Sequence, residues 1–227
     1  MTLKILFISN KEWGRKTFRF FRAHTKHHCD FLNSKSKIIN KIKNQNYDYV
    51  FVLHWSYKIP SHLLKYSKII GFHSSDLPNF SGGSPIQNQI IKGLNKTKMT
   101  AFLISEEFDK GPIILKRHLS LKGPLSDILN RCSDVSIDII KNIIYKKKLI
   151  YRSQNYRRTP LKRLSYQDNN LKLYKGLNKV YDAIRMVDSE EYKKAYVILE
   201  NKLKLEFSKA KKKTKSILCE VKITTKK

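Results

Sequence analysis

Cysteine is scarce in this sequence, and so are acidic residues and long apolar runs. The cysteines Cys29, Cys132 and Cys219 lie far apart without CxxC spacing, which argues against a disulfide framework or a zinc site. We therefore expect a reducing compartment and no metal. No apolar run approaches the ~20 residues of a membrane-spanning helix. Residues 1–25 lack a cleavable signal pattern because cations interrupt them, namely Lys11, Arg15, Lys16, Arg19 and Arg22. These absences predict a cytoplasmic protein without a membrane span.

Acidic residues are few relative to basic ones. The chain has 18 Asp and Glu against 47 Lys and Arg, a formal net charge of +29. Such an excess suggests a nucleic-acid partner. However, it is spread along the chain and is mostly lysine, as in a compositional bias, so we expect no nucleic-acid partner. One cluster, which we interpret as a solvated tail, comprises Lys209, Lys211, Lys212, Lys213 and Lys215. A basic surface would still favour an anionic substrate such as a nucleotide diphosphate.

The apolar residues that are present follow an α/β pattern. An apolar fraction of 41% over 227 residues suffices for one domain and a smaller appendage. Short apolar runs predict strands at Leu3–Ser9, Cys29–Leu32, Tyr47–Leu53, Lys68–Phe72, Met99–Ile104 and Ile113–Leu119. Helical periodicity predicts helices at Arg15–Ala23, at Ser36–Lys43 capped by Ser36, at 61–64 capped by Ser61, at 84–92 and at 123–146. Alternating β and α units indicate a three-layer domain with a mostly parallel sheet.

The composition changes after Lys148. We predict a domain at 1–148, a polar, Pro-broken connector at 149–168 and a small α+β extension at 169–227. The extension should contain one helix at Leu171–Met186, a hairpin at 195–207 turning about Asn201, and a last strand at Ile217–Ile223. The hairpin offers an edge through which two copies could pair as a homodimer.

The stretch from Gly71 to Leu115 carries the candidate chemistry. His73 ends one predicted strand, and Asp109 lies in the turn between two others. In open α/β sheets, ligands bind beyond the carboxyl ends of strands, so His73 could act as a general base that Asp109 orients. The alternatives are a loop histidine and an ordinary turn aspartate before glycine. Trp55 and Tyr57 fit plain packing as well as ring stacking on a ligand.

These residues resemble the formyltransferases that use 10-formyl-tetrahydrofolate, which include methionyl-tRNA formyltransferase and amino-sugar N-formyltransferases. The resemblance rests on GFHSSDLP at 71–78, GGSP at 82–85, DKGP at 109–112 and HWSYKIP at 54–60. YDAIRMVD at 181–188 and EFSKA at 206–210 are similar to a short sugar-modifying branch. The resemblance implies a Rossmann-like formyltransferase core with a small C-terminal helix-and-hairpin extension, and 10-formyl-tetrahydrofolate as the one-carbon donor.

The resemblance also implies a role for each matching residue. His73 would move protons as general base and acid, and Asp109 would orient its ring. Main-chain groups would bind the donor around Trp55, Ser56, Tyr57, Ile59, Glu106 and Phe108. Acceptor contacts would come from Asp76, Pro78, Gly82, Gly83 and Ser84.

One position departs from the family pattern. The family's active site is an Asn-His-Asp trio, and its Asn is Gly71 here. Losing one oxyanion donor costs on the order of 100- to 1000-fold in rate. We expect compensation by an amide of Gln87 or Asn88, by main-chain N–H groups, or by protonated His73.

Three functions compete at this point. The leading hypothesis is an N-formyltransferase for a nucleotide-linked amino-deoxy sugar used in glycan biosynthesis. The second is a methionyl-tRNA formyltransferase-like enzyme, which the charge favours, although residues 169–227 are fewer than we expect for the C-terminal β-barrel of the tRNA enzyme. The third is a basic nucleic-acid-binding module that has lost catalysis, which Gly71 and the charge of +29 suggest.

Overall fold

A computed structural model describes residues 2–146, 148–155 and 160–225. The chain divides into two compact units, each built from separate stretches of sequence. Unit 1 contains Met1–Gly82, Thr97–Leu119 and Asn130–Pro160, and unit 2 contains Gly83–Lys96, Ser120–Leu129 and Leu161–Lys227. The boundaries expected at 148 and 168 stay a prediction.

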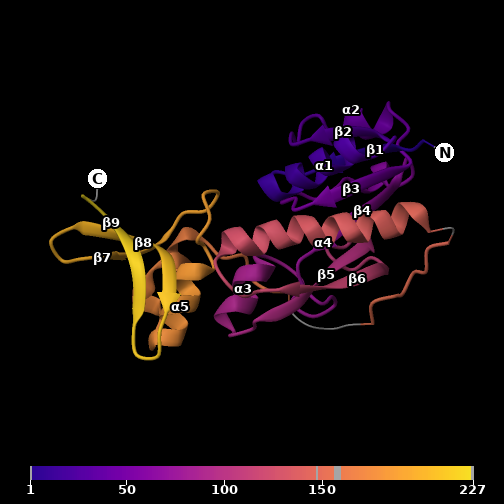
Figure 1. Cartoon of the computed structure of the whole chain (residues 1–227). Helices are drawn as coiled ribbons and strands as arrows, with labels where there is room; N and C mark the ends of the chain where they lie inside the picture. Colours follow the sequence, from indigo (N-terminus) through magenta and orange to yellow (C-terminus); the bar gives the residue numbers. More distant parts are fainter. Residues whose placement is uncertain (1, 147, 156–159, 226–227) are drawn as a thin grey trace. The chain divides into compact units, whose positions relative to one another are not determined.

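Unit 1 is built around a six-stranded sheet. Its strands are β1 (Lys4–Ile8), β2 (His28–Leu32), β3 (Tyr49–Leu53), β4 (Lys68–His73), β5 (Lys96–Leu103) and β6 (Ile113–Ser120). Their order is β2-β1-β3-β4-β5-β6 (Figure 1). β2, β1, β3 and β4 pair in parallel, and β5 runs antiparallel to β4. The α/β class with a mostly parallel sheet is therefore confirmed.

Alternation along β1 creates the layers of unit 1. Phe7 points to one face, where its ring lies 5.5 Å from that of Phe21 in α1 (Glu12–His24). The hydroxyls of Thr17 in α1 and Ser133 in α4 (Leu125–Tyr145) lie 3.0 Å apart on that side. Leu6 packs on the other face with α2 (Ile38–Lys43) and the 3₁₀ turn η1 (Ser61–Leu63). Successive β-strand side chains point to opposite faces, so both faces of the sheet are covered.

Two of the predicted helix starts in unit 1 are wrong in detail. Ser36 does not cap α2, because the N-cap is Lys37 and the Ser36 hydroxyl lies 3.0 Å from that of Ser34. Ser61 begins a single 3₁₀ turn rather than capping a helix, and Pro60 occupies the N-cap position. Serine hydroxyls form such local alternatives readily.

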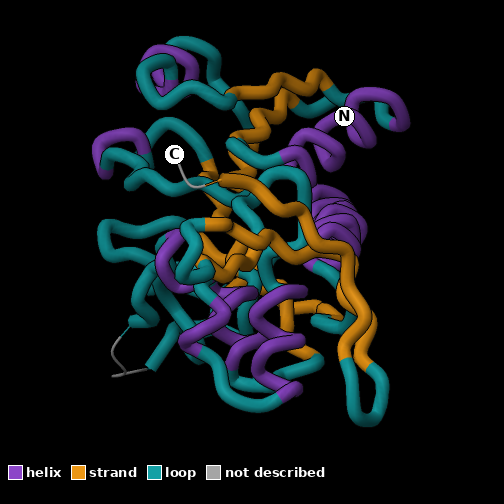
Figure 2. Tube along the Cα trace, turned by 90° about the vertical axis from the view of Figure 1, so that its left-hand side faces the viewer, coloured by secondary structure: helices purple, strands orange, loops and turns teal. Residues whose placement is uncertain are grey.

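Unit 2 combines short helices with a second, antiparallel sheet. Its elements are α3 (Pro85–Ile91), η2 (Tyr166–Asn169), η3 (Leu171–Leu173), α5 (Leu177–Arg185), β7 (Ala195–Ile198), β8 (Leu203–Lys212) and β9 (Ile217–Thr225). The sheet order is β7-β8-β9, and β8 with β9 forms the long hairpin of Figure 2. The predicted helix-and-hairpin extension is thus confirmed, with a third strand completing its sheet.

Two expectations for unit 2 are wrong. The single helix at Leu171–Met186 is interrupted, because η3 ends at Leu173 and Gly176, at φ 81°, precedes α5. Glycine adopts this left-handed conformation without the steric cost that a Cβ brings. The lysines interpreted as a solvated tail partly belong to β8, where Lys211 pairs with Leu218 of β9.

A buried cation organises the loops of unit 2. Arg185 is 3% exposed, and its Nε donates to Asp182 at 2.7 Å. Its Nη1 donates to the main-chain oxygens of Leu121 and, at 3.2 Å, Gly123. Asp188 accepts from the main-chain N–H of Lys209 at 2.7 Å. The YDAIRMVD and EFSKA segments therefore hold the interior of unit 2 together.

Candidate active site

His73 is the last residue of β4 and is buried, with 8% of its surface exposed. Its Nε2 lies 3.0 Å from the main-chain oxygen of Phe80, and its Nδ1 lies 3.6 Å from Oδ2 of Asp109. An oxygen acceptor thus faces each ring nitrogen. A ring with one proton satisfies one acceptor, and a ring with two protons satisfies both.

Asp109 lies in the turn between β5 and β6 at φ 57°. Its Oδ2 also accepts from the main-chain N–H of Gly82 at 3.0 Å. The carboxylate therefore contacts both His73 and Gly82, the first glycine of GGSP at 82–85. The structure brings together the His and Asp that the sequence singled out.

Gln154 holds the turn that contains Asp109, and the sequence did not predict this role. Its side-chain N–H groups donate to the main-chain oxygens of Asp109 at 2.8 Å and Gly111 at 2.7 Å. A Cβ on Gly111 would lie 1.7 Å from the oxygen of Leu103, so the turn requires glycine there. No local sequence pattern marks Gln154, because it lies 45 residues from Asp109.

Hydrocarbon fills the space beside Gly71. A Cβ at this position would lie 2.7 Å from Cζ of Phe102 and 3.2 Å from Cγ1 of Ile104. Phe102 is the cross-strand partner of Gly71 in β5 and is 5% exposed. An asparagine at this position would clash unless Phe102 moved.

The loop after β3 contains the first group of predicted donor contacts. The rings of Trp55 and Tyr57 meet edge-on at 5.3 Å, and Tyr57 is 45% exposed. Ser56 is half-buried. The side chain of Ile59 is buried in the core with Leu6 and Val52, so only its main chain remains for a ligand. The indole Nε1 of Trp55 is buried and has no hydrogen-bond partner among the described residues.

The second group of predicted donor contacts, Glu106 and Phe108, lies in the turn after β5. Both are exposed, Phe108 by 64%. Because β5 is antiparallel, its end at Leu103 pairs with Ile70 near the start of β4. This turn therefore begins at the end of the sheet opposite the carboxyl ends of β3 and β4, and Asp109 brings it back to His73.

Asp76 forms ion pairs that the sequence did not reveal. Its carboxylate lies 3.0 Å from Nζ of Lys98 and 2.5 Å from Nζ of Lys116. Burial acts to raise the pKa of Asp76, but hydrogen bonds from the two lysines outweigh it and hold the pKa below its usual range. The Nζ of Lys116 also donates to the main-chain oxygen of Leu77, next to Pro78. The predicted acceptor contacts at Asp76 and Pro78 thus adjoin two lysines.

The remaining predicted contacts, apart from Gly82, belong to unit 2. A Cβ on Gly83 would lie 2.5 Å from Cα of Arg163, and the Ser84 hydroxyl accepts from the main-chain N–H of Leu164 at 3.1 Å. Ser84 occupies the N-cap position of α3 without a side-chain capping bond. Gly83 and Ser84 therefore pack against the 161–164 segment of their own unit.

The two candidate amides, Gln87 and Asn88, differ in availability. The Asn88 Nδ2 lies within 3.1 Å of the main-chain oxygens of Gly83, Ser84 and Lys162. An amide nitrogen has two N–H donors, so both are committed to main-chain carbonyls. Gln87 is 7% exposed, and its amide forms no hydrogen bond to another described residue.

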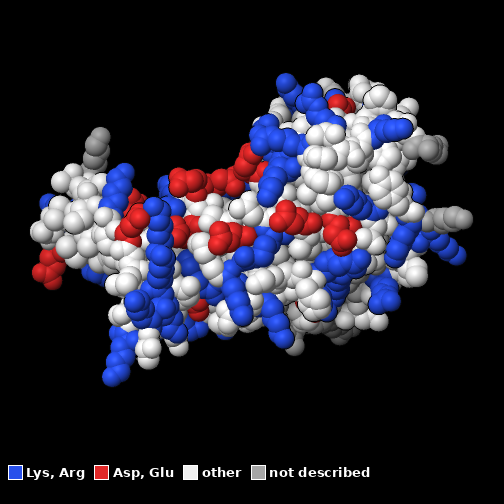
Figure 3. Space-filling model, in the orientation of Figure 1, with Lys and Arg blue, Asp and Glu red and all other residues white. Residues whose placement is uncertain are grey.

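Other features of the described residues are less specific. Lys and Arg are interspersed with Asp and Glu over the visible face in Figure 3. No group of three or more potential His, Cys, Asp or Glu metal ligands occurs in the described part of the chain. None of its helices is long and apolar enough to cross a membrane.

Comparison with known proteins gives family matches over most of the chain. The formyl transferase family matches residues 18–139, and the C-terminal domain of methionyl-tRNA formyltransferase matches residues 166–224. Methionyl-tRNA formyltransferase of Sulfurimonas denitrificans is 31% identical over 103 residues, 43% of this chain and 34% of that protein. The chain thus spans about a third of the length of the first curated relatives it matches.

Solved structures are similar over nearly the whole chain. Methionyl-tRNA formyltransferase from Clostridium thermocellum has a TM-score of 0.91 at 31% identity, covering 99% of this chain and 100% of that one. A 4-N formyltransferase from Francisella tularensis shares the fold at 19% identity, with a TM-score of 0.63 and coverage of 87% and 93%. HypX from Aquifex aeolicus, solved with tetrahydrofolic acid, shares it at 15% identity, with a TM-score of 0.71 and coverage of 92% and 38%.

The matched residues 18–139 contain His73 and Asp109, whose side chains adjoin in the fold. The chain belongs to the formyl transferase family.

Proposed function

We propose that this protein transfers a formyl group from 10-formyl-tetrahydrofolate to the amine of a nucleotide-linked amino-deoxy sugar. The observation that carries the chemistry is the buried His73–Asp109 pair. An attacking amine must lose a proton, and the departing folate nitrogen must gain one. A single imidazole can perform both transfers, because the ordinary pKa of histidine lies near neutral pH.

The geometry supports a different task for each side of the His73 ring. Nδ1 faces Asp109, whose position is set by Gly82 and by Gln154 holding its turn. Nε2 lies 3.0 Å from the Phe80 carbonyl, a contact that a reacting group can replace. We assign proton exchange to Nε2 and orientation of the ring to Asp109, as a carboxylate does in other histidine-based sites.

Because Gly71 replaces the family's asparagine, another group must donate the hydrogen bond to the developing oxyanion. Phe102 fills the space beside Gly71, so the compensation does not restore an amide there. Of the two candidate amides, Asn88 has its donors committed to three carbonyls of its own unit. His73 carrying the amine's proton is the alternative donor.

We assign the formyl donor to the loop after β3. When bound, 10-formyl-tetrahydrofolate would supply an activated formyl group. The unpartnered indole N–H of Trp55 could donate to a ring acceptor, since a buried donor left unpaired costs about 1–3 kcal/mol. Tyr57 and Phe108 offer exposed rings for stacking. The family uses a folate-derived formyl donor.

Two observations support a sugar acceptor. YDAIRMVD at 181–188 and EFSKA at 206–210 resemble the sugar-modifying branch, and buried Asp188 joins the two segments by accepting from the main-chain N–H of Lys209. The fold is shared with a sugar N-formyltransferase from Shewanella sp. over 94% of this chain, at 15% identity and a TM-score of 0.67.

A specific set of findings favours a second candidate, formylation of methionyl-tRNA. Residues 166–224 match the C-terminal domain of methionyl-tRNA formyltransferase, and the relative similar over the full chain carries that name. The net charge of +29 suits an RNA partner.

Turnover with defined acceptors tests both candidates. The assay would contain 10-formyl-tetrahydrofolate with UDP- and dTDP-linked amino-dideoxy sugars, or with methionyl-tRNA. We expect sugar formylation that His73→Asn lowers at least ~100-fold, within the range for a general acid-base group. His62→Asn, an exposed histidine of η1, is the matched control and should retain full turnover. Product with tRNA alone would establish the second candidate, and no product with either acceptor would refute the proposal.

A further inference from the structure

Unit 1 contains a cavity of about 620 Å³ at the edge strand β6. This volume lies within the ~300–1,000 Å³ typical of small-molecule sites. Its lining residues do not include His73, Asp109 or the predicted donor contacts, and Pro78 is its only member among the predicted acceptor contacts. The catalytic proposal therefore gives this cavity no occupant.

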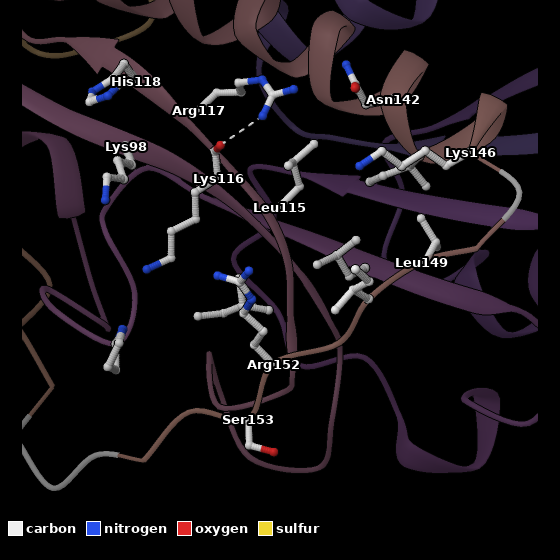
Figure 4. A pocket seen from close by; sticks show the side chains of 15 residues that line it. Lys98, Leu115, Lys116, Arg117, His118, Asn142, Lys146, Leu149, Arg152 and Ser153 are labelled. Carbon is white, nitrogen blue, oxygen red and sulfur yellow. Dashed lines mark hydrogen bonds between the residues drawn. The ribbon is translucent and has the colours of Figure 1, made fainter.

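Most of its wall comes from three segments (Figure 4): residues 113–118 of β6, the carboxyl end of α4, and the connector at Leu149, Ile150, Arg152 and Ser153. Pro78 and Lys98 complete the lining. The connector is fixed to β6 because Arg152 and Ile113 exchange both main-chain hydrogen bonds, at 2.8 and 2.9 Å. The backbone that carries the Arg152 side chain is thus held in place.

Positive charge exceeds negative charge around this cavity. Lys98 and Lys116 share the single carboxylate of Asp76. Arg117 pairs with Asp138 at 2.7 Å. The remaining two cations, Lys146 and Arg152, have no carboxylate partner among the described residues. Counted over the part of the chain that the structure describes, five cationic side chains face two carboxylates, so an excess of three positive charges remains.

The cations and the apolar residues gather on different sides. In Figure 4 the ends of Lys116 and Arg152 point into the same open space, and Lys98 lies beside Lys116. Leu115 and Leu149 lie on the other side, toward α4. A concave site lined by one sign of charge concentrates ions of the opposite sign, and a guanidinium matches the geometry of phosphate oxygens in pairs.

We propose that this cavity binds a nucleoside diphosphate, with its phosphates at Lys98, Lys116 and Arg152 and its base against the apolar side. The diphosphate group carries a charge of about −3, which balances the excess of positive charge around the cavity. Lys146 has a structural alternative, because it follows the carboxyl end of α4, where a cation is favoured without any ligand. Arg152 is therefore the diagnostic residue.

Calorimetric titration with UDP tests the site, with uridine and inorganic pyrophosphate as partial ligands. We expect Arg152→Gln to weaken UDP binding at least tenfold. Arg22→Gln, an exposed arginine of α1, is the matched control and should change it less than twofold. Uridine and pyrophosphate should each bind more weakly than UDP. Melting temperatures of both variants, measured in parallel, show that they remain folded.

The possible outcomes separate this site from the proposed catalysis. UDP binding that Arg152→Gln weakens and His73→Asn leaves unchanged would support the cavity, even if no sugar is formylated. UDP binding equally strong in Arg152→Gln and Arg22→Gln would overturn it, because the nucleotide would then occupy another site. Absence of UDP binding at millimolar concentration would also overturn it.

Discussion

At the residue scale, Gly111 shows how a turn fixes the position of Asp109 beside His73. Its missing Cβ leaves room for the Leu103 carbonyl, which a methyl group would approach to 1.7 Å. Gly111→Ala must therefore displace the turn that carries Asp109. A misplacement of about 1 Å can cost ~100-fold in rate, and we expect a loss of kcat of that order with a lower Tm. Gly93→Ala is the control. A Cβ there would meet nothing within 4 Å, but the residue has a φ of 85°, which strains an alanine. We expect this variant to lower Tm and leave kcat unchanged.

The two ion pairs of Asp76, with Lys98 and Lys116, make a pH-dependent contribution to stability. Because its pKa is held below the usual range when folded, ionised Asp76 stabilises the fold above the unfolded-state pKa of about 4. That contribution is lost as pH falls through the folded-state pKa. Asp76→Asn should therefore lower Tm relative to wild type at pH 7, and the difference should disappear in acid. A Tm difference that stays constant between pH 7 and pH 3 would contradict this assignment.

At the element scale, the strands were predictable and several polar contacts were not. Strands such as Tyr49–Leu53 are buried runs whose apolar residues are contiguous in sequence. The break at Gly176 was missed because the apolar periodicity of 171–186 continues through it. The His73–Asp109 pair was predictable from motif spacing. Gln154 and Phe102 were not, since their partners are set by chain folding rather than by local pattern.

Helix α5 depends on its buried cation. Arg185 is 3% exposed and donates to the buried main-chain oxygen of Leu121 and to the half-buried one of Gly123. Arg185→Met would keep the hydrocarbon stem but leave Asp182 and these oxygens without their donor. Breaking a buried ion pair in this way costs ~3–5 kcal/mol. We expect urea denaturation to show a loss of that size, whereas Arg22→Met on the surface should change stability by less than ~0.5 kcal/mol.

At the scale of the whole molecule, the net charge of +29 is a source of self-repulsion in the compact state. Salt screens this repulsion, because the Debye length falls from ~30 Å at 0.01 M to ~10 Å at 0.1 M. Surface ion pairs such as Lys16–Asp134 weaken at the same time, but each contributes at most ~1 kcal/mol. With 47 cations against 18 anions, repulsion should dominate. We therefore expect Tm to rise as sodium chloride increases from 0.01 to 0.1 M. A Tm that falls over this range would instead mean that ion pairs outweigh the net charge, and differential scanning calorimetry without nucleotide distinguishes the two.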